Sequence, residues 1–540
     1  MRATTRTAAI IGAGPGGLVA ARWLREVGFR TTLIEQDDGV GGQWRVGAPQ
    51  GSVWPGMRTN TSHVMTAFGD LPHPPGTPAY PTAEQLGAYL RRYAEHVGAL
   101  EDARFRTRVD EVEPDRSGGR SGGGWVVRAR RADGLTWEER FGHVVAVPGR
   151  YRVPAVPHVA GLAGFAGAGG AAHAAAYRGA DRYRGQRVLV AGHSISALEI
   201  ASELALRGAA RVVVTARRHR YVLQKILAGV PIEHRVYTRH AALASEAYPR
   251  AVSAAALKGL ILRTSGHPAQ FGAPCASEDP FEAGFTQNQF YLALVAEDRI
   301  VPRPWITHVD GAAVHFADGS AEEVDAIIFA TGYELALPFL GPTARVALAP
   351  DAARADLYHH TFHPDLPGLA FVGVYHQAGP YFPTLELQAR WVAYTWSGRC
   401  PAPTRAAMTA HIAASRACGG PAPMLRMHTW ARLLAGEVGV EPDPARWPGL
   451  ARALLFGPQS PASFRLDGPH ALPDAARRVL EDAAAFGAIP DGTLTDEERT
   501  QLRALAAARG DAAFARFVTE VASDAAPAVV AEAAHTLPIL

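Results

Sequence analysis

The chain of 540 residues suits two or three domains, and its 48% hydrophobic and 19% charged residues are typical of a globular protein. Its formal net charge of +3 and its dispersed arginines argue against nucleic acid as a partner. The three cysteines, Cys275, Cys400 and Cys418, form no CxxC pair, which argues against a disulfide reductase. No apolar run approaches the roughly 18 residues of a membrane span, so we expect a cytoplasmic protein without a membrane partner.

The first predicted elements are a buried strand at residues 8–11, a helix that ends before Gly28, and a second strand at residues 31–34. Glycines at the spacing GxGxxG fill the turn after the first strand. They permit a tight turn, the close approach of a pyrophosphate and close helix–strand packing, while the helix N-terminus attracts phosphates. The residues of this turn that we expect to bind a dinucleotide are Gly12, Gly14, Pro15, Gly16 and Gly17.

An acidic residue, Glu35, ends the second strand. Its carboxylate can accept hydrogen bonds from ribose hydroxyls, and its charge would repel a 2′-phosphate. The first nucleotide site therefore favours FAD over NADPH.

Loops are predicted from residue 41 to residue 80, with GGQW at residues 41–44 and TNTS at residues 59–62. Asn60 could line a cofactor, because an amide both donates and accepts without changing its charge, or it could cap a turn. The next predicted elements are a helix at 83–97, strands at 104–112 and 125–129 with a hairpin tip at 117–124, and a strand at 143–147.

A second strand–turn–helix unit starts at Val188 and carries the degenerate fingerprint Gly192-x-Ser194-x-x-Ala197. No acid ends its second strand. Arg217 and Arg218 stand there instead, and paired arginine donors match a phosphate, so this site is predicted to select the 2′-phosphate of NADPH. The alternative is a solvated basic surface.

The remaining chain predicts a long insertion at 221–300, buried strands at 327–331 and 369–374, and mostly helix beyond residue 401, with an Ala-rich tail. The fold class is therefore α/β, with two Rossmann-like dinucleotide-binding units.

From GGQW onward the chain resembles the class B flavin monooxygenases, which carry GGxW after the FAD-binding unit and a characteristic Asn beside the flavin. ATGY at residues 330–333 and the segment around Gly373 resemble the family's linker and its final FAD segment. The resemblance covers residues 5–470 and implies cofactor contacts at Gln43, Trp44, Thr59, Asn60, Thr61, Val109, Ser196, Ala197, Leu198, Glu199, Thr331, Gly332 and Gly373.

The family's identifying sequence FxGxxxHxxxY is matched in part, by Gly169, His173 and Tyr177. Phe165 lies two residues too early, and Gly167 holds the aromatic position. The terminal Tyr resembles the N- and S-oxygenating branch. His173 is either a hinge residue that senses NADPH or an ordinary loop histidine.

Beyond the resemblance, the Ala-rich tail predicts a helical extension at 471–540. The resemblance itself implies a first FAD segment at 1–165, an NADPH domain at 166–330 and a return to the FAD domain at 331–470. It also implies that NADPH reduces FAD, that the flavin captures O₂ as a C4a-hydroperoxide, and that a small-molecule nucleophile, here an amine nitrogen, is oxygenated, with Asn60 as the catalytic side chain. The alternatives are S-oxygenation, Baeyer–Villiger reaction of a ketone, or a non-oxygenating sensor or NADPH oxidase. A homo-oligomer is left open.

Overall fold

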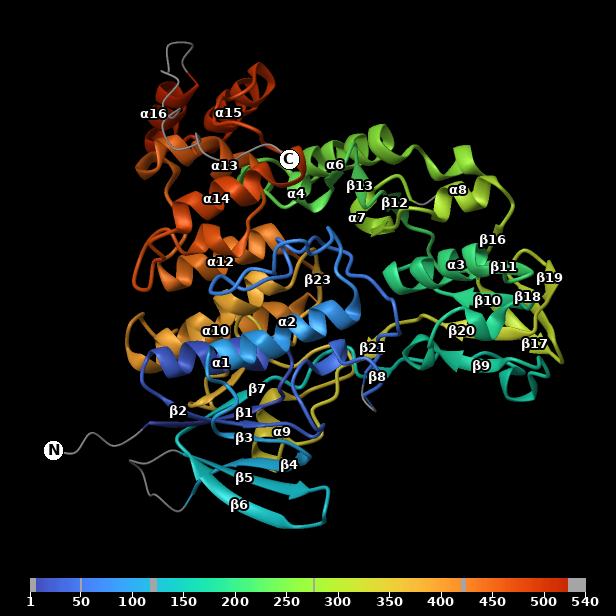
Figure 1. The fold of residues 1–540 in the computed structure, drawn as a ribbon, viewed down its shortest axis with the longest axis horizontal. Helices are drawn as coiled ribbons and strands as arrows, with labels where there is room; N and C mark the ends of the chain where they lie inside the picture. Colours follow the sequence, from blue (N-terminus) through green and yellow to red (C-terminus); the bar gives the residue numbers. More distant parts are fainter. Residues whose placement is uncertain (1–5, 49–50, 117–123, 275–276, 419–423, 523–540) are drawn as a thin grey trace.

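A computed structural model describes residues 6–48, 51–116, 124–274, 277–418 and 424–522. Cys275, most of the predicted hairpin tip at 117–124 and the end of the helical extension lie outside the described residues. Two parallel sheets organise the chain, one at the lower left of Figure 1 and one at its right. The α/β class with two Rossmann-like units is confirmed.

The first sheet has the strand order β22-β7-β1-β2-β3, and all its pairs are parallel. Its strands are β1 (Thr7–Ile11), β2 (Arg30–Ile34), β3 (Ala103–Arg104), β7 (His143–Ala146) and β22 (Leu369–Phe371). Each strand is short and apolar because both faces of the sheet are covered. Helices α1 (Pro15–Glu26), α2 (Ala83–His96) and α10 (Phe382–Ser397) lie above the sheet in Figure 1.

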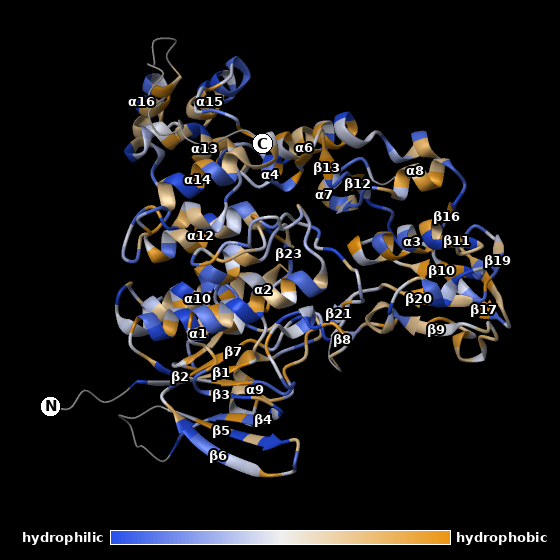
Figure 2. Ribbon diagram, viewed as in Figure 1, coloured by the Kyte–Doolittle hydropathy of each residue, from blue (hydrophilic) through white to orange (hydrophobic). Residues whose placement is uncertain are grey.

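The other face of the first sheet packs on an antiparallel sheet and on α9 (Pro342–Leu348). The antiparallel strands are β4 (Thr107–Pro114), β5 (Trp125–Arg131) and β6 (Thr136–Phe141). Figure 2 shows orange on the strands of the parallel sheets and mostly blue on β5 and β6, which cover the outside. The first sheet is thus the middle layer of three.

The second sheet has the order β16-β11-β10-β20-β9 and is also parallel. Its strands are β9 (Gly170–His173), β10 (Arg187–Ala191), β11 (Arg211–Thr215), β16 (Ile300–Arg303) and β20 (Ala326–Phe329). Helix α3 (Ile195–Arg207) covers one face, and the other face packs on the antiparallel strands β17 (Ile306–Asp310), β18 (Ala313–Phe316) and β19 (Ala321–Glu323). The chain passes between the two sheets twice, and the strands β8 (Val153–Pro154) and β21 (Tyr333–Glu334) of these connections pair with each other.

The insertion at 221–300 contains both short strands and helices. They are β12 (Tyr221–Leu223), β13 (Ile226–Leu227), β14 (Val230–Pro231), α4 (Glu233–Val236), α5 (Arg239–Ala247), α6 (Arg250–Ser265), α7 (Pro280–Ala283), β15 (Phe285–Gln287) and α8 (Tyr291–Ala296). The later chain adds β23 (Gln377–Ala378), α11 (Arg405–Ala417), β24 (Leu425–Arg426), α12 (Met427–Val438), α13 (Ala451–Phe456), α14 (Ala475–Ala484), α15 (Asp496–Arg509) and α16 (Ala512–Val521). Leu243 of α5 shares an apolar cluster with Leu502 of α15 and Phe517 of α16, so the helical extension rests on the insertion.

Some predicted boundaries were wrong. The strand predicted at 104–112 is divided into β3 and β4, because Arg106 has φ +52° and leaves the extended conformation. The strands predicted to reach Thr331 and Val374 end earlier, at Phe329 and Phe371. Gly332 (φ +92°) and Gly373 (φ +75°) follow within three residues and have left-handed backbone conformations that do not continue a strand.

Candidate cofactor sites

The first glycine turn is closed by contacts that only glycine permits. A Cβ on Gly17 would lie 1.9 Å from the Gly12 carbonyl oxygen, and a Cβ on Gly12, whose φ is +108°, would lie 2.3 Å from Val147 O. A Cβ on Gly14 would meet only Gly42 Cα, at 3.7 Å. Gly12 and Gly17 therefore hold the turn together, while Gly14 leaves its backbone open to a ligand.

Pro15 and Gly16 begin α1 directly after this turn. Pro15 occupies the first helical position, where its missing N–H is not needed, and Gly14 is the N-cap residue, with no side chain to cap the helix. A Cβ on Gly16 would lie 2.8 Å from Val147 Cγ1, so Gly16 lets α1 approach the sheet. The first N–H groups of α1 remain available to an anion.

Glu35 is buried at the end of β2 and is tied to the glycine turn. Oε2 accepts a hydrogen bond from the Ala13 N–H at 2.7 Å, and Oε1 accepts one from the Asp37 N–H at 2.9 Å. Burial raises the pKa of Glu35 above its ordinary value, against the lowering effect of the Asp37 and Ala13 donors. The carboxylate keeps free lone pairs with which it could accept a ribose hydroxyl.

The GGQW sequence packs against the first turn. The Gly41 N–H donates to Ala13 O at 2.9 Å, and a Cβ on Gly42 would lie 2.9 Å from Gly14 Cα. Residues Gly42–Trp44 form a single 3₁₀ turn in which Gln43 is partly exposed and Trp44 packs against the core above the sheet. The backbones of Gly42 and Gly14, which are distant in the sequence, are thus in close contact beside the turn.

The Thr59–Thr61 loop is held by two hydrogen bonds of Thr59, neither of which involves the Asn60 side chain. The Thr59 N–H donates to Pro81 O at 3.0 Å, and Thr59 Oγ1 donates to Thr61 O at 2.8 Å. Asn60 Oδ1 is buried and has no hydrogen-bond partner among the residues that the structure describes. Because a buried carbonyl oxygen without a donor is costly, this atom fits a site that a bound group completes.

Val109 is a core residue of β4. It pairs with Ala129 of β5, next to an irregularity in the register, and its side chain packs in the cluster between the sheets. Its side chain is 9% exposed, so it offers little surface to a cofactor.

The second glycine turn repeats the geometry of the first. Gly192 has φ +137°, and a Cβ there would lie 2.4 Å from Ala330 O. Its N–H donates to Thr215 O at 2.8 Å, as the Gly12 N–H does to Ile34 O. Ser194 is the N-cap of α3, and its hydroxyl makes no capping hydrogen bond. The degenerate fingerprint thus forms the same turn, with a hydroxyl where the first turn has Gly14.

Residues 196–199 begin α3 and do not share one environment. Ser196 is exposed, whereas Ala197 and Leu198 are fully buried in the core of the second sheet. Their side chains are therefore closed to a ligand, and only their backbone could contact one. Glu199 accepts from Asn288 Nδ2 at 3.2 Å and pairs with Lys225 Nζ at 3.6 Å.

Arg217 and Arg218 are both exposed after β11. The Arg217 guanidinium lies 4.8 Å from the ring centroid of Trp305, and Arg218 Nη1 donates to Glu282 O at 2.9 Å. Neither forms an ion pair with an acid among the described residues, so both cations are available to an anionic ligand at the end of the strand.

The ATGY segment is tied to both neighbouring strands. Thr331 Oγ1 donates to Ala155 O at 2.5 Å. His173 Nδ1 accepts from the Ala175 N–H at 3.1 Å, and its Nε2 lies 3.0 Å from Gly332 O, to which it donates. Since both ring nitrogens contact backbone, His173 connects β9 to the linker, and burial lowers its pKa.

The partial match at Phe165 has a structural explanation. A Cβ on Gly167 would lie 2.3 Å from Cζ of Phe165, so the Phe165 ring covers Gly167. The Phe165 ring therefore lies over Gly167, the position at which the family pattern has an aromatic residue.

Gly373 follows β22 at the carboxyl edge of the first sheet. Its N–H donates to Gln388 Oε1 at 2.9 Å, and Gln388 lies on α10. A Cβ on Gly373 would lie 3.0 Å from Leu385 Cδ2, so α10 packs closely over this turn.

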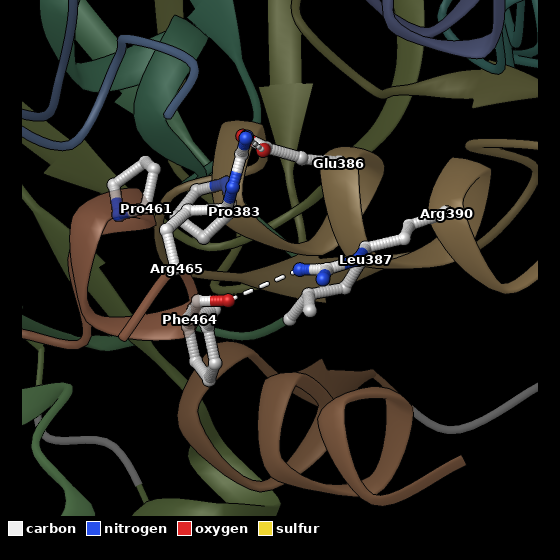
Figure 3. Close-up of a pocket in the computed structure, with 7 residues that line it drawn as sticks. All are labelled: Pro383, Glu386, Leu387, Arg390, Pro461, Phe464 and Arg465. Atoms are coloured by element: carbon white, nitrogen blue, oxygen red, sulfur yellow. Dashed lines mark hydrogen bonds and ion pairs between the residues drawn. The ribbon is translucent and has the colours of Figure 1, made fainter. Parts of the chain in front are cut away.

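A buried ion network that the sequence analysis did not predict joins α1 to α10. Arg465 Nη1 contacts Asp70 Oδ1 at 3.0 Å and Glu386 Oε1 at 3.1 Å, and Arg22 Nε contacts Asp70 Oδ2 at 2.7 Å. Figure 3 shows Arg465 pointing toward Glu386, with Arg390 donating to Phe464 O at 3.1 Å. The hollow between these side chains is too small for a water molecule, so they brace α1 and α10 rather than form a ligand site.

Sequence reasoning also missed Lys225, Glu233 and His234 of the insertion. They contact the loop around Asn60, although more than 160 residues of sequence separate the partners of each contact. No spacing rule could have paired them, because such contacts leave no local pattern.

In the part of the chain that the structure describes, no helix combines the length and apolarity needed to cross a membrane, and no group of three or more His, Cys, Asp or Glu could hold a metal ion.

Comparison with known proteins agrees with these observations. The chain is 30% identical to the N-oxide-forming dimethylaniline monooxygenase 2 of Rattus norvegicus over 498 residues, which cover 87% of this chain and 90% of the relative. S-allyl-L-cysteine S-oxygenase from Allium sativum has a similar fold (TM-score 0.60, 24% identity, 95% of this chain and 99% of that chain). So has cyclohexanone monooxygenase from Rhodococcus sp. Phi1 bound to NADP⁺ (TM-score 0.58, 17% identity, 81% and 98%). The family model described as Flavin-binding monooxygenase-like matches residues 5–485, and the chain belongs to this family.

Proposed function

We propose that this monooxygenase oxygenates the nitrogen of a small amine. The observation that carries the proposal is Asn60 Oδ1, a buried oxygen to which no group of the described residues donates a hydrogen bond. It lies in a loop that Lys225 joins to α3 of the second unit, since Lys225 Nζ lies 3.2 Å from Thr59 O and 3.6 Å from Glu199 Oε1. The N-oxide-forming activity in the name of the rat relative supports nitrogen as the acceptor.

FAD and NADPH are the cofactors of this flavin-dependent enzyme. Bound FAD would supply the activation of O₂, and NADPH the reducing electrons. We propose that the first turn, Glu35 and the residues of GGQW hold FAD, and that Gly192, Ser194, Ser196, Arg217 and Arg218 hold NADPH. The protein then contributes orientation and exclusion of water, with the Asn60 amide offering a donor and an acceptor to the bound groups.

We further propose that the chain divides at residues 165, 330 and 470 and that the protein is cytoplasmic. Limited proteolysis that cuts first near these positions would support the divisions.

A product assay tests the nitrogen preference. The FAD-loaded protein is mixed with NADPH, O₂ and either a tertiary amine, a sulfide or a cyclic ketone, and product mass is compared with NADPH consumed. We expect the amine N-oxide to account for most of the NADPH. S-oxygenation is the second candidate, because the Allium enzyme named for it shares the fold, and dominant sulfoxide or lactone would contradict the proposal.

Asn60→Ala tests the role of the side chain. It should retain FAD but release peroxide in place of oxygenated product. The control is Thr77→Ala, a hydroxyl in the same loop region that donates only to Pro74 O. Unchanged product formation in Asn60→Ala would remove this residue from the reaction.

Rapid mixing separates a monooxygenase from an NADPH oxidase or sensor. After reduction and mixing with O₂, a monooxygenase should show a long-lived species that absorbs in the near ultraviolet. Immediate recovery of the oxidised flavin spectrum with stoichiometric peroxide would identify an oxidase.

A further inference from the structure

We propose that Lys225, Glu233 and His234 of the insertion are positioning residues that fix the Asn60 loop. We call these residues the insertion clamp. The inference rests on the proposed function of Asn60 and assigns the 221–300 insertion a part in the flavin site.

The clamp contacts the loop on both sides of Asn60. On the C-terminal side, the Ser62 N–H donates to Glu233 Oε1 at 2.5 Å, and Ser62 Oγ lies 2.9 Å from His234 Nε2. On the N-terminal side, Lys225 Nζ donates to Thr59 O at 3.2 Å. The backbone is therefore held at both flanks, while the Asn60 amide between them is left unengaged at Oδ1.

Glu233 and His234 are buried to a degree that ionisable side chains rarely reach, and their partner Ser62 is buried as well. Glu233 is 0% exposed, His234 1% and Ser62 0%. Glu233 Oε2 is buried and has no hydrogen-bond partner within the described part of the chain. Burying such groups is costly, and arrangements of this kind concentrate where a site must be held in one geometry.

The ring of His234 is neutral in this setting. Burial lowers its pKa to about 3. A neutral ring has one nitrogen that can accept the Ser62 hydroxyl proton in a hydrogen bond, so the contact needs no charge.

The clamp is itself held from both sides. The Tyr80 hydroxyl donates to Lys225 O at 2.7 Å, and Lys225 pairs with Glu199 of α3. The Phe486 ring packs edge-on against the His234 ring, with centroids 5.2 Å apart. Phe486 has φ +59° and stands one residue beyond the family match, so the helical extension supports the clamp with a residue in a strained conformation. Residues of both nucleotide units and of the extension thus contact the clamp.

The test compares Glu233→Ala with Glu233→Gln in the FAD-loaded enzyme. Alanine removes the acceptor for Ser62, whereas glutamine keeps an oxygen in its place. Glu246→Ala is the matched control, because Glu246 lies on α5 of the same insertion and pairs with Arg432 and Arg509 instead. Hydrogen–deuterium exchange of peptides covering residues 59–66 and the ratio of peroxide to NADPH consumed are measured for all variants.

We expect about tenfold faster exchange near Ser62 in Glu233→Ala, the factor for one lost hydrogen bond, with a rise in the peroxide ratio. Glu233→Gln should restore both readouts to near parent values, and Glu246→Ala should change neither. Parent-like exchange and coupling in Glu233→Ala would overturn the proposal. So would equal loss in the alanine and glutamine variants, or an equal effect of Glu246→Ala.

Failure of the proposed function would look different. A parent enzyme that converts no substrate and releases only peroxide would refute the oxygenase assignment, while the exchange of residues 59–66 would still test the clamp.

Discussion

Replacing Glu233 by Gln should abolish one specific pH dependence of stability. Burial raises the pKa of Glu233 from 4.5 to about 7 in the folded protein. Between these values the folded state keeps the proton that the unfolded state releases, so the free energy of unfolding falls as the pH rises through this window. A pKa difference of this size corresponds to about 3 kcal/mol, and Glu233 is fully buried, so solvent does not screen the effect.

Glutamine resembles the protonated acid and does not titrate. Relative to the parent, Glu233→Gln should therefore gain stability progressively from pH 4.5 to pH 8, by about 3 kcal/mol in total. Urea unfolding of both FAD-loaded proteins at several pH values measures the difference, in which the other titrating groups cancel. Glu246→Gln, whose side chain is 45% exposed, is the control. A parent–variant difference that stays constant across this pH range would refute the reasoning.

Three further substitutions test separate parts of the structure. Gly17→Ala should yield colourless protein, because its Cβ would lie 1.9 Å from Gly12 O, and a yellow, FAD-saturated variant in absorbance spectra would contradict the first site. Arg217→Ala should raise the KM for NADPH about tenfold or more, because it removes a charge-assisted hydrogen bond to the 2′-phosphate, and should leave the KM for NADH unchanged. Equal changes in the two KM values would exclude the 2′-phosphate contact. Arg465→Met should cost about 3–5 kcal/mol in thermal or urea unfolding, since Asp70 and Glu386 stay buried without this cation; unchanged stability would show that the network contributes nothing.

Local patterns explain what the sequence predicted well. The helix predicted at 83–97 is α2 (Ala83–His96), because a capping box joins Thr82 to Gln85 only three positions away. Both glycine turns were recognisable for the same reason, since each combines a short apolar strand, small residues and a helix within one stretch of chain.

Contacts between distant segments could not be predicted. Ser62 is hydrogen-bonded to Glu233, and Asp70 to Arg465, but no sequence spacing predicts either pair. The burial of a predicted contact residue could not be predicted either, as Ala197 and Leu198 show, because a motif gives the position in the helix but not what that side chain packs against.

The edge strand β22 has a consequence for biosynthesis. The strands of the second sheet are all synthesised by Phe329, whereas β7 waits for its neighbour β22, whose synthesis begins only at Leu369. At roughly 5–20 residues per second, a ribosome takes on the order of ten seconds or more to cover the stretch between them. The nascent chain therefore exposes an unpaired β7 edge during that interval, when a chaperone or an early supply of flavin would have most effect on yield.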